Sequence, residues 1–361
     1  MKLLKVTTRF LLTILVCIGA AVLACTAQQP KPTIPTPPPT GKVPAKVKVK
    51  DKTTKPPKVM GLPQIEIGDG VTSERSITVD PKVSLTLCIT EGTVSVNGWS
   101  RNEVRVFVKD GSRVDFKALQ KSRDGNPVWI SLVGVKKAPG GATVNPECIA
   151  GDEIELDVPE NTSLTMKGGD TTTLIDTVRR VSVTTAGGSV SVRNVSQGVR
   201  ATTYQGDVVV SNSNGPMGLE TTSGNIVAGG ISPSEVGDAF RARTNSGAIS
   251  LQKMDFRFAE VNSITGSVLF AGELPSGGSF SFATTNGALR LVLPDKTSCR
   301  VAVTYAFGNF RSDLPLKVET ESVSAGSVKR VVGTIGTPEG GDCSLRLSTN
   351  TGAVSIRKLQ H

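Results

Sequence analysis

Histidine is almost absent from this chain of 361 residues. The only one is the terminal residue, His361. Hydrolysis by a Ser-His-Asp or Cys-His arrangement needs an interior histidine as its base, and zinc sites are usually built from histidines and paired cysteines. The sequence also contains no Cys-x-x-Cys pair, no P-loop and no EF-hand loop. It therefore predicts a protein that is not an enzyme and that uses no cofactor or metal ion.

Aromatic residues are also scarce, at 4% of the chain, whereas glycine, serine, threonine and valine are plentiful. This composition favours many short strands joined by tight turns over packed helices. No 12-residue stretch has a convincing helical stripe. The nearest helical candidate is 113–121, "RVDFKALQK", which is short and poorly capped. We therefore expect an all-β fold.

The part of the chain expected to fold lacks a charge excess. The formal net charge is +10, but Lys2, Lys5 and Arg9 supply +3 of it, and residues 28–63 supply another +7. Residues 64–361 contain 30 basic and 30 acidic residues. A nucleic-acid-binding domain needs a basic stripe to displace the counterions of phosphates. We therefore expect no basic stripe in 64–361 and no nucleic-acid partner.

The apolar run near the start of the chain is short for a membrane helix. Phe10 to Ala24 is a run of 15 residues that follows basic residues, which is typical of an export signal over 1–24. Its end, "AVLAC", is similar to a bacterial lipobox, which predicts a lipid anchor on Cys25. Ordinary cleavage after Ala24 or Ala27 is the other interpretation. Both predict an exported protein of the periplasm or cell surface, and the first also anchors it to a membrane.

Residues 28–63 contain ten prolines and eight lysines and have almost nothing that could pack in a core. This composition predicts a disordered, extended linker whose like charges repel one another. Its basic residues suit anionic lipid head groups or acidic wall polymers, and a solvated spacer is the alternative. The folded domain is then expected to occupy 64–361.

A repeated phrase dominates the rest of the sequence. An alternating segment ends in Thr or Ser, a glycine follows, and a second alternating segment begins, as in "ATTYQGDVVV" and "ETTSGNIVAG". The phrase recurs about every 20 residues, and a gap of 44 before its last copy leaves room for one more copy near Gly326, in "ESVSAGSVKRVVG". The eight marker glycines are Gly188, Gly206, Gly224, Gly247, Gly266, Gly287, Gly308 and Gly352.

This period predicts a β-solenoid, in which each copy is one rung and its alternate apolar side chains stack on those of the next rung. The glycine would let the chain reverse with a positive φ. The neighbouring Thr, Ser and Asn would bond the turn backbone and form a flat, hydroxyl-rich outer face. A β-sandwich or barrel with similar strand spacing is the alternative.

Export also changes how the six cysteines are interpreted. Cys17 leaves with the signal, and Cys25 is either lipidated or close to the cleavage point. The even number that is left in an oxidising compartment favours disulfides, with buried free thiols as the alternative. Counting alone allows three pairings of the four that remain, which are Cys88, Cys148, Cys299 and Cys343. The ends of a solenoid are where stacking stops and strands fray. We therefore predict one bond at each end, Cys88–Cys148 and Cys299–Cys343.

Three features resemble a bacterial family of exported "putative adhesin" domains. The segment "EGTVSVNGWSRNEVRVFVKD" (91–110) resembles the entry motif of the family, and the repeat resembles its middle. The segments "GNFRSDLPLKVET" (308–320) and "LRLSTNTGAVSIRKL" (345–359) resemble its end. The resemblance covers roughly 75–359. It implies a single-chain β-solenoid at the cell envelope, and it brings no ligand and no catalytic residues.

A few polar residues are candidates for chemistry. Alternation places Glu153, Glu155 and Asp157 on one strand face, where they would either be solvated or hold Ca²⁺. A polysaccharide lyase or hydrolase needs clustered carboxylates, but Asp207, Glu220 and Asp238 are scattered through the repeats. Trp99 could stack on a sugar ring, although a packed residue at the first turn is favoured.

Three functions therefore remain open. The leading one is a non-catalytic, exported envelope protein that presents a Thr/Ser/Asn-rich face to an envelope polymer or a protein partner. The second is a structural or envelope-stress accessory protein. The third is a polysaccharide lyase or hydrolase of the parallel β-helix type.

Overall fold

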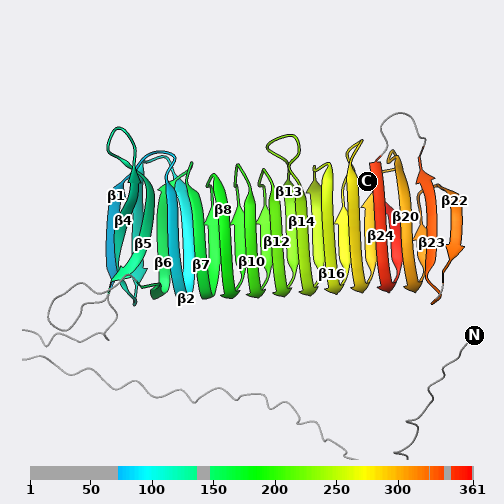
Figure 1. Ribbon diagram of the computed structural model, residues 1–361, viewed down its shortest axis with the longest axis horizontal. Helices are drawn as coiled ribbons and strands as arrows, with labels where there is room; N and C mark the ends of the chain where they lie inside the picture. The colour runs from blue at the N-terminus through cyan, green and yellow to red at the C-terminus, as the bar shows by residue number, and fades with distance from the viewer. Residues whose placement is uncertain (1–71, 136–146, 325, 337–342, 360–361) are drawn as a thin grey trace, which may run out of the picture. The chain divides into compact units, whose positions relative to one another are not determined.

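The chain is described by a computed structural model that covers residues 72–135, 147–324, 326–336 and 343–359 (Figure 1). The chain divides into two units, Met1–Pro63 and Gln64–His361. The expected signal over 1–24, Cys25 and the expected linker over 28–63 all lie outside the described residues. The part of the chain that the structure describes contains no helix with the length and apolarity needed to span a bilayer.

The expected β-solenoid is confirmed, because the strands stack side by side in one long row (Figure 1). Each regular rung consists of a long strand, a corner, a short strand and a return segment that leads to the next rung. The six regular pairs are β8 (Arg180–Gly187) with β9 (Val190–Arg193), β10 (Val199–Gln205) with β11 (Val208–Ser211), β12 (Met217–Ser223) with β13 (Ile226–Ile231), β14 (Phe240–Ser246) with β15 (Ile249–Met254), β16 (Phe258–Thr265) with β17 (Val268–Ala271), and β18 (Ser279–Asn286) with β19 (Leu289–Leu293).

Neighbouring rungs are parallel and in register. Long strands pair with long strands and short strands with short strands, so that Val181, Val199 and Met217 lie in one column across β8, β10 and β12. Equivalent positions of the repeat therefore stack on one another. Apolar side chains alternate inward along each strand, as the period-2 pattern predicts, and form one buried core that includes Phe240, Phe270 and Phe282.

Antiparallel strands close the N-terminal end. The first two rungs are single long strands, β2 (Ser84–Trp99) and β7 (Ser163–Asp176), and β7 pairs with both β8 and β9. Outside β2 lie β1 (Ser73–Thr78), β3 (Glu103–Lys109), β4 (Arg113–Lys121), β5 (Pro127–Val135) and β6 (Ile149–Pro159). The segment 113–121, which was the nearest helical candidate, is the strand β4 and pairs antiparallel with β5.

At the C-terminal end the order in space differs from the order in sequence. The last two strands, β24 (Cys343–Thr351) and β25 (Val354–Lys358), lie between the rung β18–β19 and the rung made by β20 (Cys299–Phe307) and β21 (Phe310–Ser312). The chain thus forms the outermost rung first, and its last two strands then pair between that rung and the rung β18–β19.

The extra rung expected near Gly326 is wrong. Gly326 lies in the turn between β22 (Leu316–Val323) and β23 (Lys329–Ile335), which form an antiparallel hairpin. β23 also pairs antiparallel with β20, so the hairpin closes the stack instead of extending it. The 44-residue gap between marker glycines therefore holds a closing hairpin, whose outer strand β22 is exposed along most of its length.

The marker glycines form a continuous column at the corner between long and short strands. A Cβ on Gly206 would overlap the carbonyl oxygen of Gly188, and the same overlap recurs at each later rung. Six of the eight have a positive φ, as expected, whereas Gly287 and Gly308 do not. Close approach of neighbouring backbones is therefore the requirement that all eight glycines share.

Inward threonines complete this corner. The residue three positions before the marker glycine points into the stack. In most rungs its hydroxyl donates to the carbonyl of the marker glycine on the preceding rung, and the donors are Thr203, Thr221, Thr244, Ser263, Thr284 and Thr349. Thr221 donates to Gly206 at 3.0 Å and Thr244 to Gly224 at 3.0 Å. The expected bonds from hydroxyls to the turn backbone are thus present, but these hydroxyls are buried and do not belong to an outer face.

The opposite corner follows a different rule that the sequence did not reveal. Residues that end the short strands take the left-handed conformation, with φ of 56° at Asn194, 47° at Asn212 and 49° at Lys253. Asparagine tolerates this conformation better than most residues. Because the residue type at this corner varies from rung to rung, the sequence repeat does not indicate the corner.

Candidate functional site

The four predicted cysteines form two disulfides in the structure, Cys88–Cys148 and Cys299–Cys343. These are the pairs predicted from their positions near the two ends of the domain. Cys299 and Cys343 face each other in register on β20 and β24, with their Cα atoms 4.5 Å apart. The second bond therefore ties the inserted C-terminal strand to its outer neighbour.

Trp99 is held by local contacts. Its indole N–H donates to the carbonyl oxygen of Glu103 at 2.8 Å. The guanidinium groups of Arg101 and Arg105 lie 5.0 Å and 5.6 Å from its ring centroid. Because the protein's own cations already contact the ring, the favoured interpretation of Trp99 as a packed residue describes these contacts better than a sugar platform does.

The acidic residues of β6 face basic residues of β3. Asp157 accepts a hydrogen bond from Arg105 at 2.9 Å, and Glu153 lies 3.8 Å from Lys109. The hydrogen bond and the charge of Asp157 raise the pKa of Arg105. Within the described residues, no group of three or more His, Cys, Asp or Glu side chains is placed to hold a metal ion.

The three carboxylates weighed for catalysis do not come together. Asp207 lies at the glycine corner, where it accepts a hydrogen bond from the backbone N–H of Asn225 at 2.7 Å. Asp238 lies in the return segment 232–239 and accepts backbone bonds from Ser234 and Glu235, both at 2.9 Å. Only Glu220 projects outward from a strand, β12. Two of the three therefore stabilise turns.

The outward side chains of the long strands form a broad, solvent-exposed surface, which we call the long-strand face. It consists of the outward positions of β8, β10, β12, β14, β16, β18, β24 and β20. Its charged side chains are six arginines and two glutamates, namely Arg180, Arg200, Arg241, Arg243, Arg300, Arg346, Glu220 and Glu260. This face therefore concentrates positive charge, and the expectation of no basic stripe in 64–361 is wrong for it. The acidic residues that make the domain neutral overall lie mainly on other surfaces.

Hydroxyl and amide side chains occupy only part of this face. Near the glycine corner the exposed residues include Thr222, Asn245, Thr285 and Asn350, but also Tyr204, which is 68% exposed. Farther from the corner, arginines occur among hydroxyl side chains such as Ser182 and Thr202. The arginines were not expected, because the side of the sheet to which they point becomes clear only once the strands are aligned.

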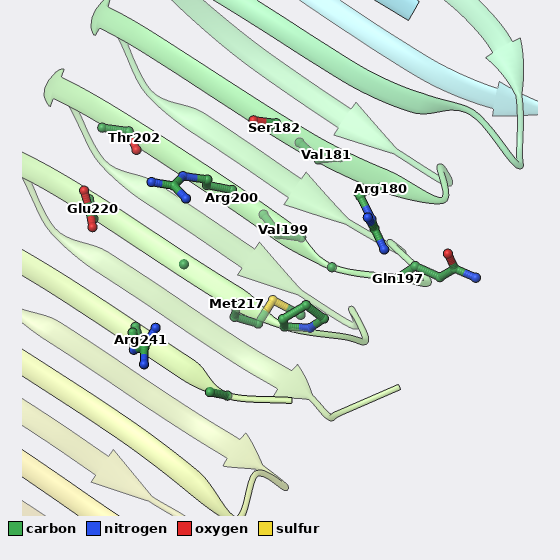
Figure 2. Close-up of a pocket in the computed structure, with 14 residues that line it drawn as sticks. Arg180, Val181, Ser182, Gln197, Val199, Arg200, Thr202, Met217, Glu220 and Arg241 are labelled. Carbon is green, nitrogen blue, oxygen red and sulfur yellow. The ribbon is translucent and has the colours of Figure 1, made fainter. Parts of the chain in front are cut away.

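A groove of about 530 Å³ opens in the long-strand face where β10 and β12 begin. Figure 2 shows Arg180 and Ser182 on β8, Arg200 on β10, Glu220 on β12 and Arg241 on β14 around it. Met217 and the backbone of Gly198 and Gly218 also line it. The groove is the candidate functional site, and the sequence did not reveal it.

The model of one protein family matches residues 76–357, which is most of the chain. The chain belongs to the Toastrack DUF4097 family. The resemblance to a family of adhesin-like domains that the entry, repeat and exit motifs indicated is thereby confirmed. A search of curated proteins finds no match.

Three solved structures resemble this Toastrack DUF4097 chain. One is a "putative cell adhesion protein" from Clostridium sporogenes, with 9% identity, TM-score 0.23 and coverage of 80% of this chain and 100% of its own. Another is a "putative adhesin" from Parabacteroides merdae, with 10% identity, TM-score 0.27 and coverage of 81% and 98%. A third is a "putative lipid binding protein" from Parabacteroides distasonis, with 11% identity, TM-score 0.28 and coverage of 81% and 98%. At these scores we draw no conclusion from the three likenesses.

Proposed function

We propose that the chain is an exported, non-catalytic binding module of the cell envelope. One observation carries the proposal: the long-strand face repeats the same outward positions in register over eight rungs, and it contains a groove. Such an array offers many equivalent contacts, and a repetitive partner can engage several of them at once. An envelope polymer fits this requirement, and a protein partner is the alternative.

Export is part of the same proposal. It is supported by the basic and apolar start of the chain, and by two disulfides, which persist in oxidising compartments. We further propose that Cys25 carries a lipid and that 28–63 is a flexible linker between the anchor and the domain at 64–361.

Sedimentation with isolated bacterial envelopes tests the proposal. The full chain is produced by export so that its cysteines oxidise, and it is then mixed with envelope fragments. We expect the protein to sediment with the envelopes and to release no reducing sugar. Release of sugar would favour the lyase or hydrolase alternative, and a protein that stays in the supernatant would contradict a binding role and favour a structural accessory.

A further inference from the structure

Gly218 is the floor of the groove, and the backbone does not require a glycine there. Gly218 lies outward on β12, in register with Arg200 on β10 and Arg241 on β14. A Cβ at this position would meet only the side chain of Arg200, at 4.0 Å, and φ does not lie in the left-handed region. At the corner glycines, by contrast, a Cβ would overlap backbone. The missing side chain at Gly218 therefore serves the surface, because it keeps the groove open.

Arginines flank this floor on both sides. Arg200 and Arg241 belong to strands that are two steps apart in the sheet, roughly 10 Å. Arg241 lies 3.7 Å from Glu260, whereas no ion pair involves Arg200 or Arg180 within the part of the chain that the structure describes. A guanidinium group presents a planar fork of donors that matches a carboxylate. Arg200 is thus an unpaired donor, Arg241 is shared with Glu260, and the charge of Arg180 acts on Asp238.

The return segment 232–239 borders the end of the groove, where Ala239 contributes to the lining. It is the longest return segment of the regular rungs, and its loop rises above β13 and β14 in Figure 1. Burial alone would raise the pKa of Asp238, but hydrogen bonds from Glu235 and Ser234, together with the charge of Arg180, outweigh it and hold the pKa below its ordinary value. The ionised carboxylate therefore stays in place to order the segment beside the groove.

We propose that this groove binds an acidic polysaccharide, with Arg200 and Arg241 pairing with carboxylates of sugar units that lie along the stack. The inference rests on the proposed binding function and specifies the class of its partner. A regular polymer of carboxylate-bearing sugars matches arginines at fixed intervals, and the shallow groove admits a chain that continues beyond it. The lining holds no aromatic side chain, so charge carries the recognition.

Two features favour a polysaccharide over nucleic acid. Single-stranded nucleic acid is usually held by aromatic side chains that stack on bases, and the groove lining has none. Nucleic-acid-binding domains also have a strong overall positive charge, whereas 64–361 has 30 basic and 30 acidic residues. A groove with local positive charge in a neutral domain suits a sparser array of single carboxylates.

Calorimetry with polygalacturonate, a polymer of carboxylate-bearing sugars, tests the inference on the full exported chain. Its fully methyl-esterified form is the matched probe, because it has the same sugar chain without the charge. We expect the free acid to bind and the ester not to bind. Arg200→Ala and Arg241→Ala should each weaken binding about tenfold, which corresponds to about 1.4 kcal/mol, because each removes one charge-assisted hydrogen bond.

Further variants separate the groove from general charge. Arg290→Ala removes an exposed arginine from a short strand and should leave binding unchanged. Gly218→Gln fills the floor and should abolish binding without lowering the melting temperature. Glu220→Gln removes a negative charge beside the groove and should tighten binding a few-fold. Equal binding of acid and ester, wild-type binding by Gly218→Gln, or equal losses in Arg290→Ala and Arg200→Ala would each overturn the inference.

Envelope sedimentation distinguishes failure of the inference from failure of the proposed function. If the wild type and the Gly218→Gln variant sediment with envelopes equally well, the binding module stands and the groove is not its site. If the wild type does not sediment at all, the binding role itself fails. Binding to DNA or to anionic lipid vesicles in place of polygalacturonate would also overturn the inference and would identify a different class of partner.

Discussion

The long and short strands of each rung come from one repeat, yet the two surfaces that they form differ in how their charges are arranged. On the short-strand side, Arg193 pairs with Asp176 at 2.7 Å and Arg357 lies 3.4 Å from Asp313. On the long-strand face, Arg200 has no such partner among the described residues and lies beside the open floor of the groove.

This difference shows that a count of basic residues does not locate a binding surface. Both sides carry arginines. Of the four on the short strands, Arg193 and Arg357 pair with carboxylates, whereas no ion pair involves Arg290 or Arg311 among the described residues. An exposed ion pair contributes little stability, but it does occupy the donors that a ligand would need. What distinguishes the long-strand face is an unpaired arginine beside a missing side chain, Arg200 beside Gly218.

The largest expected effect concerns the covalent bond on the long-strand side of the C-terminal end. Cys299–Cys343 joins β20 to β24, whereas their short-strand neighbours β21 and β25 share only three paired residues. Replacing both cysteines with alanine should lower the free energy of unfolding by about 4 kcal/mol, because the closed loop of the unfolded chain is released. Urea unfolding measures the loss. An unchanged midpoint would mean that the bond does not form in the exported protein.

The next largest effect is a difference in stability between substitutions at two glycines a few residues apart. Gly224→Val should cost about 3 kcal/mol, because its Cβ would overlap the carbonyl of Gly206 at the corner that joins the two surfaces. Gly218→Val, on the strand β12 that leads to this corner, is the matched control. It should cost nothing or stabilise slightly, since glycine weakens a strand. Thermal melting of both variants checks this. Equal losses would mean that Gly218 is structural and that its absent side chain does not serve the surface.

Much of the fold could be predicted because it depends on local repetition. Alternation indicated the strands, and the glycine phrase indicated the rungs and one corner. The order of the last rungs could not be predicted, because the insertion of β24 between β18 and β20 depends on which strand pairs with which. The Gly326 hairpin was misjudged for the same reason, since a glycine between two strands is compatible with a rung corner and with a hairpin turn, and only the pairing distinguishes them.

The groove could not be predicted from the sequence, for a different reason. Arg200, Gly218 and Arg241 are 18 and 23 residues apart in sequence, and only the register of three strands brings them together. Gly218 also resembled any other glycine of the repeat. The number of charges over 64–361 was correct, but a sum contains no information on which face of a sheet a side chain occupies.

A smaller effect distinguishes the inner from the outer threonines. Thr244→Val removes a buried hydroxyl that donates to Gly224 and should cost about 1 kcal/mol, the usual contribution of one hydrogen bond. Thr222→Val changes an exposed residue and should be nearly neutral in stability. Denaturant midpoints measure both. A larger loss for Thr222→Val would mean that the inward and outward positions of the rung are assigned the wrong way round.

The smallest expected effect is a pH dependence on the short-strand side. Burial alone would raise the pKa of Asp176, but hydrogen bonds from Asn194, Thr177 and Arg193 outweigh it and hold the pKa below its ordinary value of 3.8. The carboxylate therefore stabilises the fold above about pH 4, and this contribution is lost as the pH falls through the lower folded value.

Asp176→Asn should remove this dependence and cost less than about 1 kcal/mol near neutral pH, because the pair with Arg193 is largely exposed. Stability curves of both proteins between neutral and acidic pH provide the measurement. A difference that persists unchanged in acid would show that the asparagine acts through packing and not through charge.

Arginine-specific labelling tests the central claim, that the long-strand face is the binding surface. The full exported chain is treated with phenylglyoxal, with and without bound envelope material, and the reacted arginines are located by mass spectrometry. We predict that Arg180, Arg200 and Arg241 become protected when the envelope is bound, while Arg290 and Arg311 on the short strands react as before. Protection of the short-strand arginines alone, or equal reactivity of all five in both states, would contradict the account.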